Sequence, residues 1–361
     1  MQSFSRVQLA ATVFLFQLGS SPLFLLAGEA RRDAWLSVLV GMLSGLLLLI
    51  LVTLPIHRRE PGKSLIEMLP AYFGKWLGGA VAAAYVLYFS YKSVRNVREF
   101  GDWMILYLLP QTPLYFIMLV LMLISAFAVY HGVEVFFRLA ELLWPWIVLM
   151  YAILFGIIIF SHLFHPENLQ PVMEHGLKPV LEAALPEVVS FPFGEMVLFL
   201  MFWKHSDRAR ETSRTTLFSF ASAGLFLVFA NMTLICVLGA MAGTSVIPLL
   251  EVTSLLKFAE RLDPFVLLML FIGVYMKQTA YYLGASLALS QLTGMNRKLA
   301  IVPIGALIYF GSLAFRSYMQ QVRFGFKYNL NYHFPIFQIA IPLVLLTVML
   351  IRSPKPATTG E

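Results

Sequence analysis

Two short polar segments interrupt long apolar stretches of the chain, and each combines glycine and serine with proline. The first contains Gln17, Gly19, Ser20 and Ser21 and is followed by a proline, and the second contains Ser190, Phe191, Pro192, Phe193, Gly194 and Glu195. Because proline lacks an N–H group and disfavours a helical conformation of the residue before it, we expect a helix to break at each segment. The N–H groups and the positive dipole end exposed at a break can bind an anion such as a carboxylate. Taken alone, each segment is also consistent with a simple kink, since glycine and proline are common in membrane helices.

A lysine lies near the middle of another apolar stretch. Lys277 is flanked by Gly273 and Tyr281, one helical turn before and after it. A charged side chain at the centre of a membrane costs about 2.5–3.5 kcal/mol on insertion scales, so we expect it to face a cavity or an opposite charge. Glu195 is the carboxylate predicted at a matching depth. Two hypotheses stay open: Lys277, together with Tyr281, substitutes for a bound cation or gates the site, or the Lys277–Glu195 pair only holds two helices in register.

Further side chains complete a predicted pocket. Glu195 either accepts a hydrogen bond from a ligand amine or satisfies backbone N–H groups freed at the second segment, and Gln17 is open to the same two interpretations at the first. Tyr88 either points its hydroxyl into the pocket or only packs. Phe191 and Phe193 would supply apolar walls. Together these residues predict a small pocket for a small zwitterion with an apolar portion.

The composition determines which elements must position these residues. The 361 residues are 59% hydrophobic and only 12% charged, with a mean hydropathy of +0.79, which excludes an ordinary soluble protein. A membrane-spanning helix needs about 20 mostly apolar residues. Ten stretches meet this requirement: 7–28, 34–55, 77–95, 113–130, 142–160, 184–203, 215–241, 264–292, 299–315 and 334–351. The sequence therefore predicts an all-α integral membrane protein of ten transmembrane helices, with a single transmembrane domain over 1–361.

The two interrupted stretches are the first and the sixth of these ten. Interrupted helices at corresponding positions of two halves indicate an inverted repeat and a transporter-type binding site. We therefore expect a first repeat over about 7–160 and a second over about 184–351, with helices 1 and 6 broken at the same depth. This matched placement favours a binding site over two unrelated kinks.

Basic residues predict the orientation and some of the connecting segments. With the N-terminus inside, 14 Lys and Arg residues fall on the inner side and 11 on the outer side, and the loop 204–214 is the clearest inner segment. Both termini, including the tail 352–361, are therefore expected in the cytoplasm. A short interfacial helix is predicted over 64–76, and an i,i+4 pair of Glu134 with Arg138 extends the fifth helix. Lys92, Arg95, Arg98, Glu99 and Asp102 are interpreted as a cluster at the outer end of the third helix.

Several function classes find no support in the sequence. The net charge of +7 forms no long basic run, so nucleic acid is not an expected partner. The sequence contains no pattern typical of a nucleotide site, a zinc protease or a serine hydrolase, and we expect neither an enzyme nor a cofactor. His162 and His165 without further ligands are a weak metal signal, and no metal site is predicted.

A series of motifs resembles the endospore germination permease family, the B subunits of nutrient germinant receptors. The motifs occur in order along the whole chain: SRVQL with QLGSSPLFL, DAW, PGKSL, REFGD with LLPQTPL, RLAELLWP, SFPFGE and the region of Lys277. The resemblance implies membership of the amino acid–polyamine–organocation superfamily, with a LeuT-like five-plus-five fold. It also implies a subunit of the spore inner membrane that senses amino acids or other nutrients together with an A subunit and a lipoprotein C subunit. Lys277 would then occupy the position where related transporters bind a sodium ion between helices 1 and 8.

Three functions remain open at this point. The first is a sensing subunit that binds its ligand at the two breaks and signals by a conformational change. The second is an active secondary transporter for an amino acid or polyamine, which would use the same pocket. The third is a structural subunit with a vestigial site.

Overall fold

The computed structural model of the chain describes residues 3–206, 209–243, 247–256 and 263–352. Within these ranges the chain is helical and contains no strand. Of the predicted cytoplasmic tail 352–361, only Arg352 lies within the described residues.

Fourteen α-helices make up most of the described chain. They are α1 (Arg6–Leu18), α2 (Ala34–Leu48), α3 (Leu54–Arg59), α4 (Leu65–Phe73), α5 (Lys75–Tyr107), α6 (Leu114–His131), α7 (Val133–Ile159), α8 (Leu177–Ala183), α9 (Ala209–Leu238), α10 (Pro248–Leu255), α11 (Asp263–Thr293), α12 (Arg297–Leu313), α13 (Tyr318–Phe324) and α14 (Ile341–Ile351). Shorter or wider helical turns join them. These are η1 (Ser21–Leu23), η2 (Gly28–Asp33), η3 (Leu49–Thr53), η4 (Pro166–Leu169), η5 (Ala184–Val188), η6 (Phe193–Met201), η7 (Trp203–His205), η8 (Gly239–Gly243) and η10 (Gly325–Ala340).

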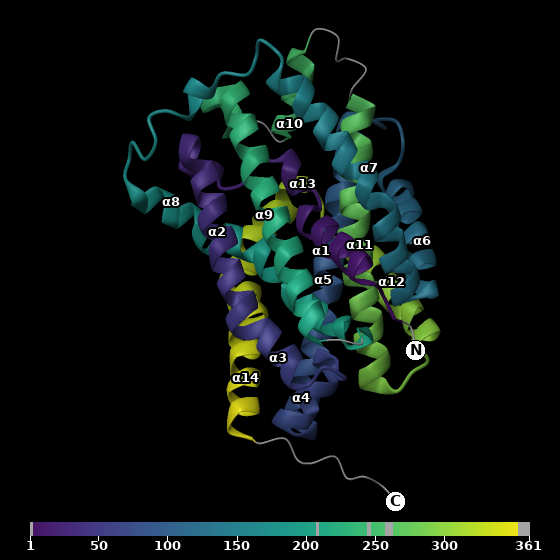
Figure 1. Cartoon of the computed structure of the whole chain (residues 1–361). Coiled ribbons are helices and arrows are strands. Elements are labelled where there is room, and N and C mark those ends of the chain that lie inside the picture. Colours follow the sequence, from purple (N-terminus) through teal and green to yellow (C-terminus); the bar gives the residue numbers. More distant parts are fainter. Residues whose placement is uncertain (1–2, 207–208, 244–246, 257–262, 353–361) are drawn as a thin grey trace, which may run out of the picture.

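The helices form one bundle around α1, α5 and α11 (Figure 1). The helix α11 packs along α5, and α1 contacts α7, α9 and α11. In Figure 1, α2 and α14 lie on one side of this centre and α6 and α12 on the other. Large apolar side chains on the periphery are exposed, for example Trp76 at 89% and Phe160 at 91%, as expected where lipid is the solvent.

Seven helical segments of the described chain are long and apolar enough to cross a membrane. They are Gly28–Arg59, Leu114–His131, Val133–Ile159, Leu177–Met201, Arg210–Leu238, Pro264–Thr293 and Tyr318–Ile351. Of the other predicted crossings, α1 has 13 residues and α12 has 17, and α5 is long but carries several charged side chains. These segments therefore support a multi-pass membrane protein, while the number of ten crossings stays a prediction.

The third helix is longer than the sequence prediction. We expected it to end near residue 95, but α5 continues for 33 residues, from Lys75 to Tyr107. The predicted end is wrong because charged residues normally mark the end of a membrane helix, whereas Lys92 and Arg98 of α5 are buried against other helices, with 5% and 4% of their surface exposed.

The helical conformation changes near both predicted interruptions. The helix α1 ends at Leu18, Gly19 adopts a φ of +46°, and only the three-residue turn η1 follows. In the other segment, helical residues continue to Ser190, Phe191 and Pro192 form a turn, and η6 begins at Phe193. A φ in this range favours glycine, which explains why Gly19 stands at the end of α1.

Two predicted connecting features are present. The helix α4 occupies most of the segment 64–76, and Ser64 and Glu67 form a capping box at its start. The helix α7 begins at Val133, and the Arg138 guanidinium lies 2.6 Å from the Glu134 carboxylate, which confirms the predicted pair. In Figure 1, α1 begins and α14 ends toward the end of the bundle where α3 and α4 lie.

Candidate functional site

A buried carboxylate between two lysines forms the centre of the candidate site. Lys92 Nζ lies 2.5 Å from Oε1 of Glu195, and Lys277 Nζ lies 2.5 Å from Oε2. The side chains of Lys92, Glu195 and Lys277 are exposed by only 6%, 0% and 2%. Because buried charges are tolerated only when they are paired, this cluster holds α5, η6 and α11 together. It also buries one positive charge in excess.

The Lys277–Glu195 pair expected from the sequence is therefore present, but the placement of Lys92 was wrong. Lys92 does not belong to an outer cluster, because its ammonium reaches the same carboxylate as Lys277. The error arises from the extra length of α5, which moves residue 92 from the end of a short helix to the interior of a long one.

Two glycines allow α11 to approach the end of α1. A Cβ atom at Gly273 would overlap the carbonyl oxygen of Gly19, and a Cβ atom at Gly19 would lie 2.8 Å from Cδ of Lys277. The Lys277 side chain therefore passes directly over Gly19 on its way to Glu195. Its ammonium also lies 3.9 Å from the ring centroid of Phe191, a favourable cation–π distance.

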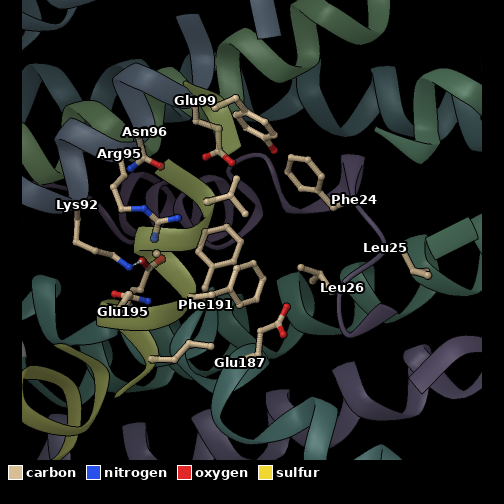
Figure 2. A pocket seen from close by; sticks show the side chains of 16 residues that line it. Phe24, Leu25, Leu26, Lys92, Arg95, Asn96, Glu99, Glu187, Phe191 and Glu195 are labelled. Atoms are coloured by element: carbon tan, nitrogen blue, oxygen red, sulfur yellow. Dashed lines mark ion pairs between the residues drawn. The ribbon is translucent and has the colours of Figure 1, made fainter. Parts of the chain in front are cut away.

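A cavity of about 260 Å³ opens beside this cluster (Figure 2). Its polar wall is a stripe along α5, formed by Lys92, Arg95, Asn96 and Glu99. The other walls come from three segments: Phe24, Leu25 and Leu26 after η1; Glu187, Phe191 and Glu195 of the interrupted segment; and Tyr318, Val322, Gly325, Phe326, Asn329 and Leu330 of α13 and η10. The cavity is thus polar on the α5 side and rich in aromatic rings elsewhere.

Two of the predicted ligand-binding residues, Phe191 and Glu195, line this cavity. Gln17, Ser20 and Ser21 are fully or almost fully buried near the end of α1 and do not line it. Neither amide atom of Gln17 nor the hydroxyl of Ser21 has a hydrogen-bond partner among the described residues. Ligand contact by these side chains stays a prediction.

Three other predicted residues pack against neighbouring helices instead. The hydroxyl of Tyr88 accepts a hydrogen bond from Nε2 of Gln338 at 2.8 Å, so it is not directed into the cavity. Gln338 also fills the space beside Gly194, where a Cβ atom would overlap its side-chain oxygen. Phe193 packs on Phe220 of α9, with ring centroids 5.5 Å apart.

Two further predicted residues lie beside the site. Pro192 precedes η6 at the interruption. Tyr281 is fully buried, and its ring centroid lies 6.0 Å from Lys92 Nζ, outside the cavity wall.

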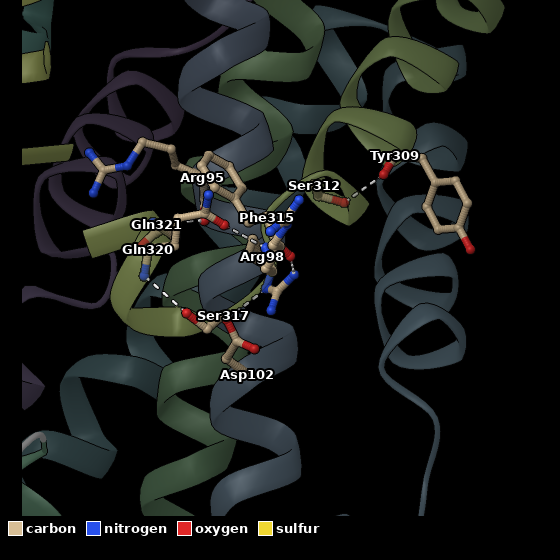
Figure 3. Close-up of polar contacts among 10 residues, drawn as sticks. Arg95, Arg98, Asp102, Tyr309, Ser312, Phe315, Ser317, Gln320 and Gln321 are labelled. Atoms are coloured by element: carbon tan, nitrogen blue, oxygen red, sulfur yellow. Dashed lines mark hydrogen bonds and ion pairs between the residues drawn. The ribbon is translucent and has the colours of Figure 1, made fainter. Parts of the chain in front are cut away.

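The far end of α5 is tied to α12 and α13 (Figure 3). Nε of Arg98 lies 2.7 Å from the Asp102 carboxylate, and its guanidinium donates to the carbonyl of Phe315. Nε2 of Gln321 donates to the carbonyl oxygen of Arg95 at 3.4 Å. These contacts hold the segment that begins α13 against the polar stripe of α5.

The sequence interpretation missed the polar stripe of α5 as a pocket wall. A signal for it exists, because Lys92, Arg95 and Glu99 recur at spacings of three and four residues and therefore share one helix face. The contribution of η10 was also missed, including Gln338 and Asn329. Nδ2 of Asn329 donates to the hydroxyl of Ser190 at 3.0 Å, so η10 packs directly on the interruption.

This arrangement is suited to binding a small polar molecule with an apolar part. The cavity offers cations, carboxylates and aromatic walls from several helices. Among the described residues, no group of three His, Cys, Asp or Glu side chains is placed to hold a metal ion.

Comparison with known proteins identifies the family and the fold. The spore germination protein family matches residues 3–319. Spore germination protein KB of Bacillus subtilis (strain 168) is 32% identical over 348 residues, which are 94% of this chain and 93% of the relative.

Two solved transporters share the fold. MhsT in complex with L-phenylalanine superposes with a TM-score of 0.68 at 14% identity, over 86% of this chain and 79% of MhsT. Mhp1, a nucleobase-cation-symport-1 family transporter with bound bromovinylhydantoin, gives a TM-score of 0.59 at 13% identity, over 89% of this chain and 74% of Mhp1. The chain belongs to the spore germination protein family and is a multi-pass membrane protein with a transporter-like fold.

Proposed function

We propose that this chain is the nutrient-sensing subunit of a spore germinant receptor. In this proposal it binds a small nutrient, in the first instance an amino acid, beside the interruptions at Gly19 and Gly194. It then signals by a conformational change to A and C partner subunits in the spore inner membrane. Membership of the spore germination protein family supports the receptor role.

The proposed topology has ten crossings in a five-plus-five inverted repeat. In it, α1 is the first half of a broken helix 1, and the segment Leu177–Met201 is a broken helix 6. The end of α1 at Leu18 and the turn at Phe191 and Pro192 support these breaks, and the fold shared with MhsT and Mhp1 supports the repeat. Both termini face the cytoplasm in this proposal.

One observation carries the binding proposal. The cavity meets the interrupted segment at Phe191 and Glu195, and Glu195 is the carboxylate shared by Lys92 and Lys277. A ligand that contacts Glu195 therefore acts on a charge cluster that joins α5, η6 and α11. Since a ligand shifts an equilibrium only by its differential affinity for two states, a site at such a junction can convert binding into a helix movement.

The other predicted residues have stated roles in this proposal. Gln17, Ser20 and Ser21 offer polar atoms at the end of α1, and two of these side chains have no partner among the described residues. Gly19 and Gly194 allow close approach of the backbone, and Pro192 interrupts the second helix. Phe193 and Tyr88 pack outside the cavity and stabilise the helices that form its walls. Lys277, with Tyr281, takes the place of a bound cation beside Gly19, in agreement with the position of the lysine side chain over that residue.

An active secondary transporter is the alternative function. The observation that favours it is the fold shared with MhsT and Mhp1, both described as complexes with small organic ligands. A transporter and a sensor can use one pocket, so the two functions differ in flux and not in binding.

Two measurements test the proposal. The purified chain is screened by thermal shift against amino acids, sugars and nucleosides, and hits are followed by radiolabelled uptake into proteoliposomes containing the chain alone. The sensor predicts a specific hit without sustained flux, whereas sustained substrate-coupled flux supports the transporter. No hit across the panel overturns both and leaves a structural subunit. Undiminished binding after Gly19→Leu with Gly194→Leu would exclude this pocket, with Gly79→Leu on an open face of α5 as the control.

A further inference from the structure

We infer that Arg95 is the residue that binds the ligand, and that the cavity therefore selects nutrients that carry a carboxylate. Arg95 has this role only if the chain binds a nutrient in the cavity, as proposed above. The sequence suggests backbone N–H groups at the breaks of helices 1 and 6 as the anion-binding groups. In the structure, the Arg95 side chain of α5 lines the cavity and can bind the anion instead.

Two cations, Lys92 and Arg95, and three carboxylates, Glu99, Glu187 and Glu195, line the cavity. Lys277 lies outside the lining, but it pairs with Glu195 as Lys92 does, so the charges of Arg95, Glu99 and Glu187 lie outside this cluster. The third carboxylate of the cavity, Glu187, enters from the segment before Phe191 and lies away from Arg95 in Figure 2. A bound zwitterion would meet the Arg95 guanidinium with its carboxylate and the Glu187 carboxylate with its amine, and would leave the net charge of the cavity unchanged.

Arg95 differs from the neighbouring basic residues Lys92 and Arg98 of α5, because its guanidinium has an N–H group without a hydrogen-bond acceptor in the part of the chain that the structure describes. Lys92 is paired with Glu195, and Arg98 is paired with Asp102 and donates to a backbone carbonyl. Within the described chain, the buried Nε of Arg95 has no hydrogen-bond acceptor, and its guanidinium interacts with the Glu99 carboxylate one turn further along α5 only through the charges of the two groups. A planar guanidinium with free N–H groups matches the two oxygens of a carboxylate better than any other side chain.

The surroundings of Arg95 fix its position in the wall. A Cβ atom at Gly325 of η10 would overlap the guanidinium, so this glycine makes room for it. The amide of Asn96 lies beside Arg95 in Figure 2 and offers a second donor. Phe24 and Phe191 supply apolar surface for the rest of the ligand. The cavity has a volume of about 260 Å³. Pockets for drug-sized ligands typically measure about 300–1,000 Å³, so this smaller cavity suits a small nutrient.

The test measures affinity for matched compounds with and without a carboxylate. The purified full chain, in lipid nanodiscs, is titrated with L-alanine, L-phenylalanine and 3-phenylpropionate, and with phenylalaninamide, glucose and inosine as members that lack the carboxylate. The variants are Arg95→Gln, Gly325→Ala and, as the control, Arg323→Gln, which removes an exposed charge from the neighbouring helix α13. Gly325→Ala displaces the guanidinium without removing its charge and thus separates position from net charge.

We expect the wild-type chain to bind a carboxylate compound, and Arg95→Gln to weaken that binding at least tenfold. Gly325→Ala should weaken it in the same direction, and Arg323→Gln should leave it within twofold. Binding that survives Arg95→Gln within twofold, or equal binding of phenylalanine and its amide, overturns the assignment. A thermal unfolding profile of Arg95→Gln like that of the wild type excludes misfolding as the cause of weaker binding. If Arg95→Gln does not fold, the affinity of Gly325→Ala tests the assignment in its place.

Failure of this assignment is distinguishable from failure of the proposed function. If glucose or inosine binds and no carboxylate does, the role of Arg95 is wrong while nutrient sensing stands. If no member of the panel binds the wild-type chain, both are wrong.

Discussion

Lys92 of α5 and Lys277 of α11 contact opposite oxygens of the same carboxylate, that of Glu195, each at 2.5 Å. Two ammonium groups this close would repel each other in a buried site without the carboxylate between them. The three side chains therefore act as one unit, and the stability of the bundle depends on the charge of Glu195 more than on either lysine.

Glu195→Gln is expected to be strongly destabilising, because it leaves two buried ammonium groups without a counter-charge. Removal of one partner of a buried ion pair typically costs about 3–5 kcal/mol. Thermal unfolding in detergent measures the effect, and the exposed carboxylate in Glu182→Gln serves as the control. The double variant Glu195→Gln with Lys92→Met should recover part of the loss, and equal melting temperatures of Glu195→Gln and the wild type would contradict the shared-carboxylate arrangement.

Lys277→Met separates the two hypotheses for this lysine. Glu195 keeps Lys92 as a partner in this variant, so folding should suffer less than in Glu195→Gln. If Lys277 substitutes for a cation beside Gly19, ligand affinity falls at least tenfold while the melting temperature changes little. Ligand titration and thermal unfolding of the same preparation give both values, and unchanged affinity in a folded variant leaves only the structural role.

Gly273→Ala is expected to disturb the contact between α11 and the end of α1. The added methyl group would overlap the Gly19 carbonyl oxygen, and backbone cannot yield as a flexible side chain does. Overpacking of this kind typically costs about 1–3 kcal/mol. Gly79→Ala in α5 is the matched control, because a Cβ atom there meets nothing within 4 Å, and it should be neutral or slightly stabilising. Similar unfolding temperatures for the two variants would argue against the close helix contact.

The Lys204–Glu67 ion pair predicts a pH dependence near α4. Burial raises the pKa of Glu67, but hydrogen bonds from Ser64 and the Lys204 ammonium outweigh it and hold the pKa below its ordinary value of 4.5. A lowered pKa means that the pair stabilises the fold above about pH 4.5 and loses this contribution as the pH falls through the lowered value. Because Glu67 is partly exposed, Lys204→Met should cost only about 0.2–1 kcal/mol at pH 7. Unfolding midpoints of the two proteins should converge in acid, and a pH-independent difference would rule out this origin.

Accessible cysteines test the proposed orientation. In a Cys236→Ser background, which removes the single native thiol, His175→Cys should react with a membrane-impermeant maleimide added to intact cells. Gly62→Cys, in the exposed connection between α3 and α4, should react only after the membrane is opened. The reverse pattern would show that the chain ends face outward, and reaction of both sites in intact cells would show that they share one side.

Much of the architecture could be predicted from the sequence because long apolar stretches leave a chain few options in lipid. Each stretch must satisfy its own backbone, so an all-helical membrane protein follows from composition and length. The two interruptions are predicted from local sequence as well, since the restrictions that proline and glycine impose are local. The helix α1 ends at Leu18, and Phe191 and Pro192 form a turn between helical residues that reach Ser190 and the start of η6.

Contacts between distant segments could not be predicted this way. Lys92 was assigned to an outer cluster because the sequence shows a charge and not its partner, and its partner lies 103 residues away at Glu195. The same holds for Gln338, whose Nε2 donates a hydrogen bond to the hydroxyl of Tyr88 although the two residues are 250 positions apart in the sequence. This hydrogen bond directs the Tyr88 hydroxyl away from the cavity. Local patterns determine where helices start and stop, because the forces that break them act over a few bonds. Only the packed bundle decides which side of each helix meets which neighbour. The packing therefore also decides which charged side chains are paired and which, like Arg95, have an N–H group without an acceptor among the described residues.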